Sequence, residues 1–192
     1  MTAKLLHRAS QHSIVSGDLM NPPEEKYEIR QAIMTVIDRN ASLRVIQEIA
    51  RHHSVNIVCF DAEMMAGREH ADAAIRHARR SIISPKPISN SFEMEALLFA
   101  AGSRQCSFAA GFGIHEGENK MFVCVYPPKE GIWKVLSHHM DFVTENWNDL
   151  GPQKVLRLIS LFGITQDELE TVDRSRLKEL ILERIALLEV CR

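Results

Sequence analysis

Several polar residues near one short predicted helix are of the types that bind nucleic acids. Lysine and arginine hold phosphate groups, while amide and hydroxyl side chains form hydrogen bonds with the edges of unpaired bases. We therefore predict a nucleic-acid-binding set, to which the preceding predicted helix contributes two members. A solvated helix corner would carry the same residue types, so this second interpretation stays open. The set consists of Lys86, Asn90, Ser91, Arg104 and Gln105, together with Arg79 and His70.

No group of residues has the spacing of a catalytic centre. The pattern Gly111-x-Gly113-x-x-x-Gly117 differs from a dinucleotide-binding loop, and no nucleotide-binding lysine motif or nucleophile elbow occurs. Glu93 and Glu95 are two residues apart in a predicted helix, so their side chains diverge. Cys106, near Arg104, is the only candidate for a catalytic cysteine, and we expect it to be a small buried core residue. We predict that the protein is not an enzyme.

The nine histidines do not have the spacing of a metal site. His52-His53 and His138-His139 are adjacent pairs, so the two rings of each pair point in different directions. His70 and His77 are seven residues apart and have no carboxylate at ligand spacing. We therefore predict no metal and no cofactor.

Composition predicts a soluble protein with one local basic patch. The chain has 192 residues, 45% of them hydrophobic and 25% charged, and a net charge of −2. Residues 68–106 carry six Lys or Arg against four Asp or Glu, so any RNA binding should be local. The four cysteines are widely spaced and lie in or beside apolar runs, which favours buried thiols in a reducing compartment. There is no membrane-spanning run and no secretory signal, and we predict a cytoplasmic protein.

Two predicted helices position the nucleic-acid-binding set. Asn90 and Glu93 have the spacing of a capping box, which would begin a helix that ends before Gly102 in a left-handed conformation. Ser103 would then cap the next helix and place Arg104 in its first turn. Free backbone N–H groups at such a helix end favour an anion.

The remaining pattern predicts an α/β (α+β) fold over residues 1–192, with a small mixed or antiparallel sheet flanked by helices and a helical C-terminal part. Strands are expected around 14–15, at 55–60, at 120–126 and at 140–143, the last paired with 120–126. Helices are expected at 24–37, 42–50, 67–82, 131–138 and 152–162, at a capping box beginning at Thr165, and from Asp173 to the C-terminal end.

The last predicted helix has an apolar stripe wider than one core face needs. Leu187, Leu188 and Val190 are therefore candidates for a surface that binds a partner protein, although core packing is the leading interpretation for most of the stripe.

Three segments resemble one family, and they occur in the order that this family has. Residues 86–105 contain Lys-Pro-Ile-Ser-Asn-Ser-Phe-x-Met-Glu and then Ala-x-Gly-x-Arg-Gln, which is similar to the core motif of the small accessory subunit of the KEOPS complex, the TPRKB family. Phe60-Asp61-Ala62, with His70 eight residues further on, resembles the segment upstream of that motif. Glu183-Arg-Ile-Ala-Leu-Leu188 resembles the family's C-terminal signature. Cys106 stands where the family has isoleucine.

The resemblance covers residues 54–191, and residues 1–53 lie outside it. It implies a non-catalytic subunit that binds the small kinase/ATPase subunit of KEOPS and the unpaired 3′ CCA end of tRNA. The complex would install threonylcarbamoyl on the adenosine beside the anticodon, and the other KEOPS subunits would be indirect partners. The alternative is a protein–protein module that binds and stabilises a small kinase without contacting RNA.

Overall fold

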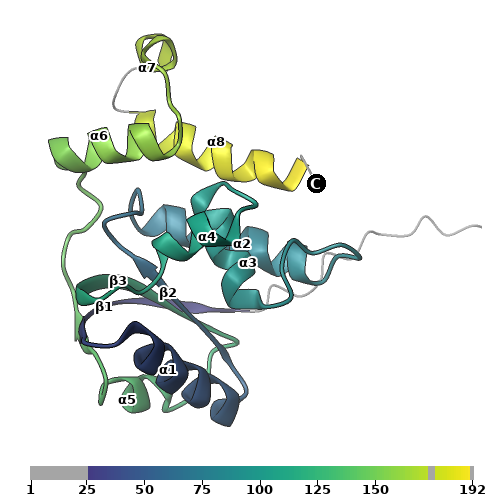
Figure 1. The fold of residues 1–192 in the computed structure, drawn as a ribbon, viewed down its shortest axis with the longest axis vertical. Helices are drawn as coiled ribbons and strands as arrows, with labels where there is room; N and C mark the ends of the chain where they lie inside the picture. The colour runs from purple at the N-terminus through teal and green to yellow at the C-terminus, as the bar shows by residue number, and fades with distance from the viewer. Residues whose placement is uncertain (1–25, 173–175, 191–192) are drawn as a thin grey trace, which may run out of the picture.

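The computed structural model describes residues 26–172 and 176–190. A four-stranded antiparallel sheet in the order β2-β3-β1-β4 forms the middle layer, and helices cover both of its faces (Figure 1). The predicted fold class, with its helical C-terminal part, is confirmed. The elements in chain order are β1 (Glu28–Val36), α1 (Arg39–His53), β2 (Asn56–Asp61), α2 (Arg68–Ile82), α3 (Phe92–Ala101), α4 (Cys106–Ala109), the 3₁₀ helix η1 (Ala110–Phe112), β3 (Gly117–Tyr126), α5 (Ile132–Leu136), β4 (Asp141–Val143), α6 (Pro152–Leu161), α7 (Gln166–Val172) and α8 (Leu177–Val190).

The predicted helix at 24–37 is wrong, because this segment forms strand β1. All nine residues of β1 pair with β3, and Ile29 lies opposite Cys124. The apolar residues at 29, 33, 36 and 37 match helical spacing, but the run is also rich in β-branched residues, which favour strands. A strand covered on both faces has apolar residues on both sides, so its period does not separate it from a helix.

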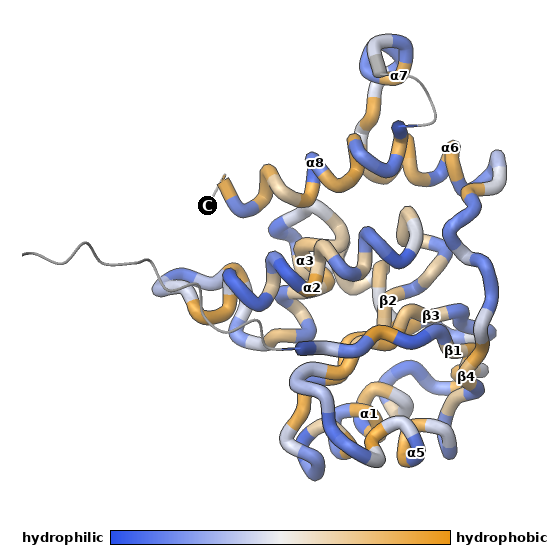
Figure 2. The backbone as a smooth tube through the Cα atoms, turned by 180° about the vertical axis from the view of Figure 1, so that it is seen from behind, coloured by the Kyte–Doolittle hydropathy of each residue, from blue (hydrophilic) through white to orange (hydrophobic). Residues whose placement is uncertain are grey.

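Each face of the sheet has its own hydrophobic core. Phe122 and Cys124 of β3 point to the face covered by α2, α3, α6 and α8. Met121, Val123 and Val125 point to the opposite face, which α1 and α5 cover. This alternation follows from the two-residue period of a strand. Figure 2 shows hydrophobic residues along the strands at the middle of the molecule.

The helix ends agree with the sequence at some positions and differ at others. Helix α1 begins earlier than predicted, because Asp38 Oδ1 accepts a hydrogen bond of 3.0 Å from Ala41 N. The capping box before α7 is confirmed, since Thr165 N donates to Glu168 Oε2 at 2.8 Å and Glu168 N donates to Thr165 Oγ1 at 3.3 Å. The predicted strand around 14–15 and the predicted cap at Asp173 lie outside the described residues.

The fourth strand has a different neighbour from the one predicted. Strand β4 pairs with β1, with Phe142 opposite Ala32, and not with β3. Strand β3 is already occupied on both edges by β1 and β2, so it has no edge left for a third partner. Among the described residues, no helix is both long and apolar enough to cross a lipid bilayer.

Candidate functional site

The loop before α3 is held by one buried carboxylate. Glu95 is fully buried, and its carboxylate accepts hydrogen bonds from Ile88 N at 3.1 Å and from Ser89 N at 2.6 Å. The Ser81 hydroxyl, at the end of α2, donates to the same carboxylate. Burying a carboxylate is costly unless donors surround it, so Glu95 and the loop hold each other in place. This clamp fixes the segment that presents Lys86 and Asn90, both of which are exposed.

Helix α3 begins one residue later than predicted. Ser91 is its N-cap, and the Ser91 hydroxyl accepts a hydrogen bond of 3.1 Å from Met94 N. The predicted capping box of Asn90 with Glu93 is therefore wrong. Asn90 lies outside the helix and makes no hydrogen bond within residues 26–172 and 176–190, so the helix does not use its amide.

His70 belongs to the core and not to a surface that RNA could reach. Its side chain is 1% exposed, and its ring lies edge-on to Phe162. Nδ1 accepts from Ala66 N at 3.1 Å, and Nε2 donates to the carbonyl oxygen of Ala100 at 2.9 Å. Burial lowers the pKa of His70 to about 4, so the ring is neutral at pH 7. The prediction that His70 contacts RNA does not fit this position, which ties the start of α2 to the end of α3.

The turn after α3 has the geometry that its glycine predicts. Gly102 has a φ of 56°, and its N–H donates to the carbonyl oxygen of Phe99 at 3.0 Å, while Ser103 N reaches Leu98 O at 3.1 Å. A Cβ on Gly102 would be 3.7 Å from Phe162 and 3.8 Å from the backbone of Arg184, which are ordinary contacts. The left-handed backbone, and not a lack of space, is what requires glycine here.

The sequence predicted that Arg104 lies in the first turn of a helix, and this prediction is wrong. Helix α4 begins at Cys106 and has four residues, and the Ser103 hydroxyl accepts from Gln105 N at 3.2 Å without capping the helix. A helix end of this length has little dipole, so the predicted anion site at its N-terminus is wrong. Arg104 and Gln105 are nevertheless exposed at the turn. Cys106 is exposed as well, so the expectation that it is a core residue is also wrong.

The structure separates the predicted nucleic-acid-binding set into two groups. Lys86, Asn90 and Ser91 lie at the start of α3, and Arg104 and Gln105 lie after its end. Helix α3 has ten residues, which makes it about 15 Å long. The two groups therefore cannot hold the same nucleotide.

Helix α8 packs beside the turn at 102–105, and together they form a groove of about 520 Å³, which we name the corner groove. Leu187 of α8 and Phe108 of α4 are 49% and 37% exposed on its walls. Leu188 is 7% exposed and belongs to the core, so it does not fit the predicted partner-binding surface, whereas Val190 is 79% exposed. Phe108 and Arg184 were missed by sequence reasoning, because they meet the turn only after α8 has packed. Arg184 Nη2 donates to Glu168 Oε1 at 2.5 Å.

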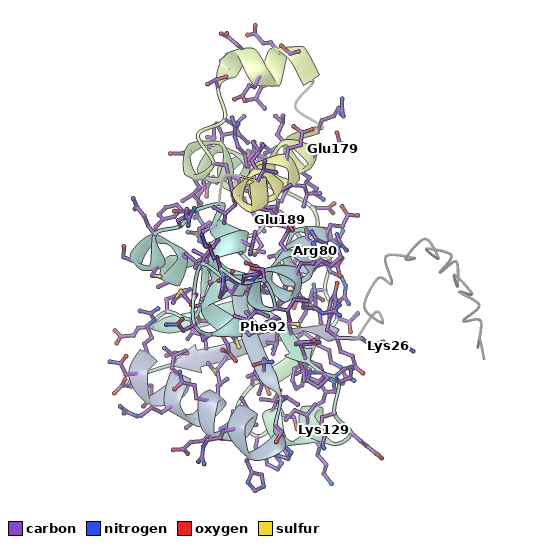
Figure 3. The ribbon with its side chains drawn as sticks, turned by 90° about the vertical axis from the view of Figure 1, so that its right-hand side faces the viewer. Lys26, Arg80, Phe92, Lys129, Glu179 and Glu189 are labelled. Carbon is purple, nitrogen blue, oxygen red and sulfur yellow. The ribbon has the colours of Figure 1, made fainter. Side chains whose placement is uncertain are left out.

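Much of the basic face of α2 is neutralised within the chain. Arg76 pairs with Asp72, and Arg80 pairs with Glu189 of α8 at 2.9 Å. Figure 3 shows Arg80 and Glu189 where α2 and α8 meet. Hydrogen bonds from Arg80 are the main cause that lowers the pKa of Glu189 to about 2, and His77 donates to the same carboxylate. Arg79 differs, since its guanidinium lies over the Tyr126 ring at 5.0 Å.

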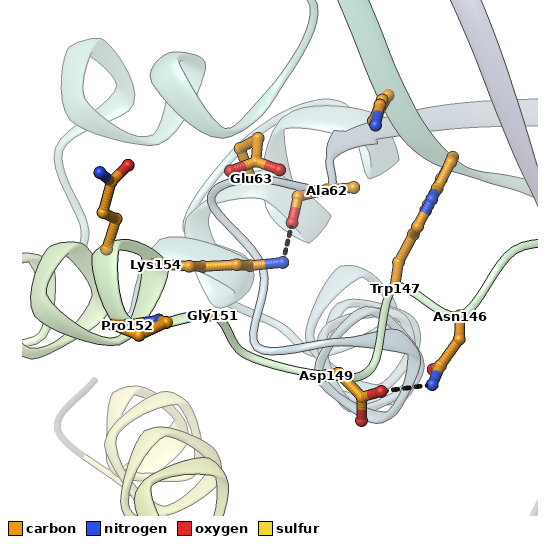
Figure 4. Close-up of a pocket in the computed structure, with 10 residues that line it drawn as sticks. Ala62, Glu63, Asn146, Trp147, Asp149, Gly151, Pro152 and Lys154 are labelled. Carbon is orange, nitrogen blue, oxygen red and sulfur yellow. Dashed lines mark hydrogen bonds between the residues drawn. The ribbon is translucent and has the colours of Figure 1, made fainter.

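A second pocket, of about 560 Å³, lies where the chain enters α6 (Figure 4). Lys154 Nζ donates to the carbonyl oxygen of Ala62 at 2.7 Å, and burial lowers the pKa of this lysine. Asn146 Nδ2 donates to Asp149 Oδ2 at 2.6 Å. The Lys154 hydrogen bond joins α6 to the end of β2, and the Asn146 hydrogen bond holds the loop before α6, so these polar groups already have a structural role.

The thiols and possible metal ligands complete the description of reactive groups. Cys59 and Cys124 are buried, as predicted, and burial raises the pKa of Cys59 to about 12. Cys191 lies outside the described residues. Within residues 26–172 and 176–190, no three His, Cys, Asp or Glu side chains are grouped so that they could hold a metal ion.

Comparison of the chain with known proteins does not identify a family. No protein-family model matches the chain, and no curated protein matches it.

Proposed function

We propose that the protein is a non-catalytic subunit of a KEOPS-type complex. In this role it binds the small kinase/ATPase subunit and the 3′ CCA end of tRNA, and it assists threonylcarbamoyladenosine modification in the cytoplasm. The proposal depends on the resemblance of three sequence segments, and the fold supports it through the place where these segments meet.

The observation that carries the proposal is the contact between distant parts of the resemblance. Gly102 and Gln105 belong to the core motif, and Arg184 and Leu187 belong to the C-terminal signature, yet all four line the corner groove. His70, from the upstream segment, forms a hydrogen bond with Ala100 beside the same turn. A motif that maintained only one helix would not need all three segments at one place.

The two groups at the ends of α3 suit different parts of an RNA end. Arg104 can hold a phosphate with two hydrogen bonds, and the Gln105 amide can donate to and accept from a base edge. Lys86 lies in the loop before α3, at the other end of a helix about 15 Å long, and would contact a phosphate further along the strand. The exposed Leu187 and Val190 provide an apolar strip on α8 for the kinase subunit.

A titration with intact tRNA and with the same tRNA lacking its 3′ CCA tests this function at two salt concentrations. We expect tighter binding to intact tRNA, weakening as salt rises, because phosphate contacts release counterions. Arg104→Ala should lower affinity for intact tRNA, whereas Arg44→Ala, on the exposed side of α1, should not. Equal binding of both tRNAs would refute end capture.

The second candidate function is kinase binding without RNA, and the exposed strip on α8 favours it. Co-purification with the kinase subunit tests this candidate separately. Val190→Glu should abolish co-purification without changing tRNA affinity, because Val190 is exposed on α8 and does not line the corner groove. If the kinase binds and neither tRNA does, the protein is a kinase-binding module only.

A further inference from the structure

A groove with unpaired cations runs between α2 and the start of β1, on the side of α2 that faces away from α3 and α8. Two adjoining cavities of about 540 and 380 Å³ form it, and Ile29, Arg30 and Arg68 line both. Strand β4 covers β1 only from Gln31 to Ile33, so the first residues of β1 leave this edge open. We name this feature the α2–β1 groove.

Helix α2 lines the α2–β1 groove with Arg68 and Asp72, and Arg76 and Arg79 continue the same side of the helix beyond the two cavities. Arg68, Asp72, Arg76 and Arg79 follow each other at intervals of four, four and three residues, which places them on one helical face. The stripe is about 16 Å long from first to last residue. The opposite face of α2, with Ala71, Ala74 and Ala78, is buried in the core.

The charge of the α2–β1 groove is positive even after its internal pairs are counted. Asp72 is paired with Arg76, and Glu28 is paired with Arg30 at 3.5 Å. Lys26 and Arg68 in the groove, and Arg79 beside Tyr27 at its border, then have no carboxylate partner within the described residues, which gives this region a local net charge of +3. The whole chain has a net charge of −2, so this concentration is local.

Arg68 has a position that helix stability does not explain. It is the first residue of α2, where a positive charge opposes the helix dipole. Its backbone N–H is satisfied by Asn148 Oδ1 at 2.9 Å, but its side chain is exposed. An arginine at this position can bind an anion outside the helix.

Two aromatic rings hold the guanidinium of Arg79 in place. Its guanidinium lies 5.0 Å from the Tyr126 ring centroid and 5.8 Å from that of Tyr27. Its Nε is buried and has no hydrogen-bond partner in the described part of the chain. Because the Nε edge is buried, an acceptor such as phosphate would reach this guanidinium through its Nη groups.

These observations favour a linear polyanion over a single phosphate. A stripe of about 16 Å is longer than one phosphate group, so its cations can contact several phosphates of one strand. The Gln31 amide, which lines the smaller cavity, already uses Nε2 and Oε1 in hydrogen bonds with the Glu145 backbone, so the cations of the groove suit contacts to a phosphate backbone. We propose that the α2–β1 groove binds the phosphate backbone of an RNA strand without reading its base sequence. This goes beyond the capture of a 3′ end and does not depend on it.

The test compares two pairs of charge-removing substitutions in the full-length protein. Lys26→Gln with Arg68→Gln removes two cations from the α2–β1 groove. Arg44→Gln with Lys134→Gln removes the same two residue types from exposed positions on α1 and α5, across the sheet. The probes are a short single-stranded RNA that ends in CCA and the same RNA without it, each titrated over a series of salt concentrations.

The groove pair should weaken binding of both RNAs equally, on the order of tenfold in low salt, and reduce the salt slope by about 2. The control pair should leave affinity and slope unchanged. Wild-type affinity and slope in the groove pair would overturn the proposal. Binding of poly-glutamate as tight as that of RNA would also overturn it, because the groove would then be an acidic-peptide site. Loss of CCA preference alone, after Arg104→Ala, would concern the corner groove and not this one.

Discussion

Replacing Glu95 with alanine should destabilise the protein strongly, because Glu95 holds the loop of the motif at 86–105. Three donors would lose their acceptor: the Ser81 hydroxyl, Ile88 N and Ser89 N. A hydrogen bond to a charged group contributes about 1.5–3 kcal/mol, but losses in one network do not add. Ile88 and Ser89 are half-buried and can regain water, whereas Ser81 is fully buried and cannot. We therefore expect Glu95→Ala to lower the free energy of unfolding by about 3–5 kcal/mol.

Glu93→Ala is the matched control for this change. Glu93 lies two residues earlier in the same first turn of α3, so both substitutions lose a similar interaction with the helix dipole, about 0.3–1 kcal/mol. Urea unfolding, followed by circular dichroism and tryptophan fluorescence, measures both variants. Glu95→Gln adds a local measurement, because amide hydrogen exchange at Ile88 and Ser89 should accelerate when the acceptor weakens. A Glu95→Ala variant within about 1 kcal/mol of Glu93→Ala would refute the clamp.

Two further predictions concern the same helix pair. Folding lowers the pKa of His70 from 6.5 to about 4. Between these two pH values the unfolded chain binds a proton that the folded chain does not. The free energy of unfolding should therefore fall by about 3 kcal/mol as the pH drops from 6.5 to 4. Urea unfolding across that range should show a shallower pH slope in His70→Gln. Gly102→Ala should cost about 1–2 kcal/mol of unfolding free energy, since φ is 56°, whereas Gly111→Ala, where φ is not positive and a Cβ would meet no atom within 4 Å, should cost none.

Local patterns were sufficient to predict elements whose signals agree with each other. The helix at 67–82 is α2, with its predicted alanine stripe fully buried at Ala71, Ala74 and Ala78. The strand at 55–60 is β2, displaced by one residue. In both cases, residue type, period and flanking breakers indicate the same structure, so tertiary contacts had no conflict to resolve.

Local patterns failed where a segment's surroundings determine its structure. Residues 28–36 match helical spacing, yet their place in the centre of a sheet makes them β1. Asn90 and Ser91 are both good caps, and the choice of Ser91 follows from the loop that Glu95 holds one turn away. Neither outcome can be read from a window of adjacent residues, because strand partners and clamp donors are distant in sequence.

The sequence by itself determined the types of residue at the candidate sites and the turn at Gly102, because backbone conformation at glycine is a local property. Only the tertiary structure decided which polar residues share a surface. Packing of α2 against α3 buries His70, and the length of α3 separates Lys86 from Arg104. The open edge of β1 brings Lys26 and Arg68 to one groove, with Arg79 beside Tyr27 at its border, since helix and strand come together only when the sheet has formed.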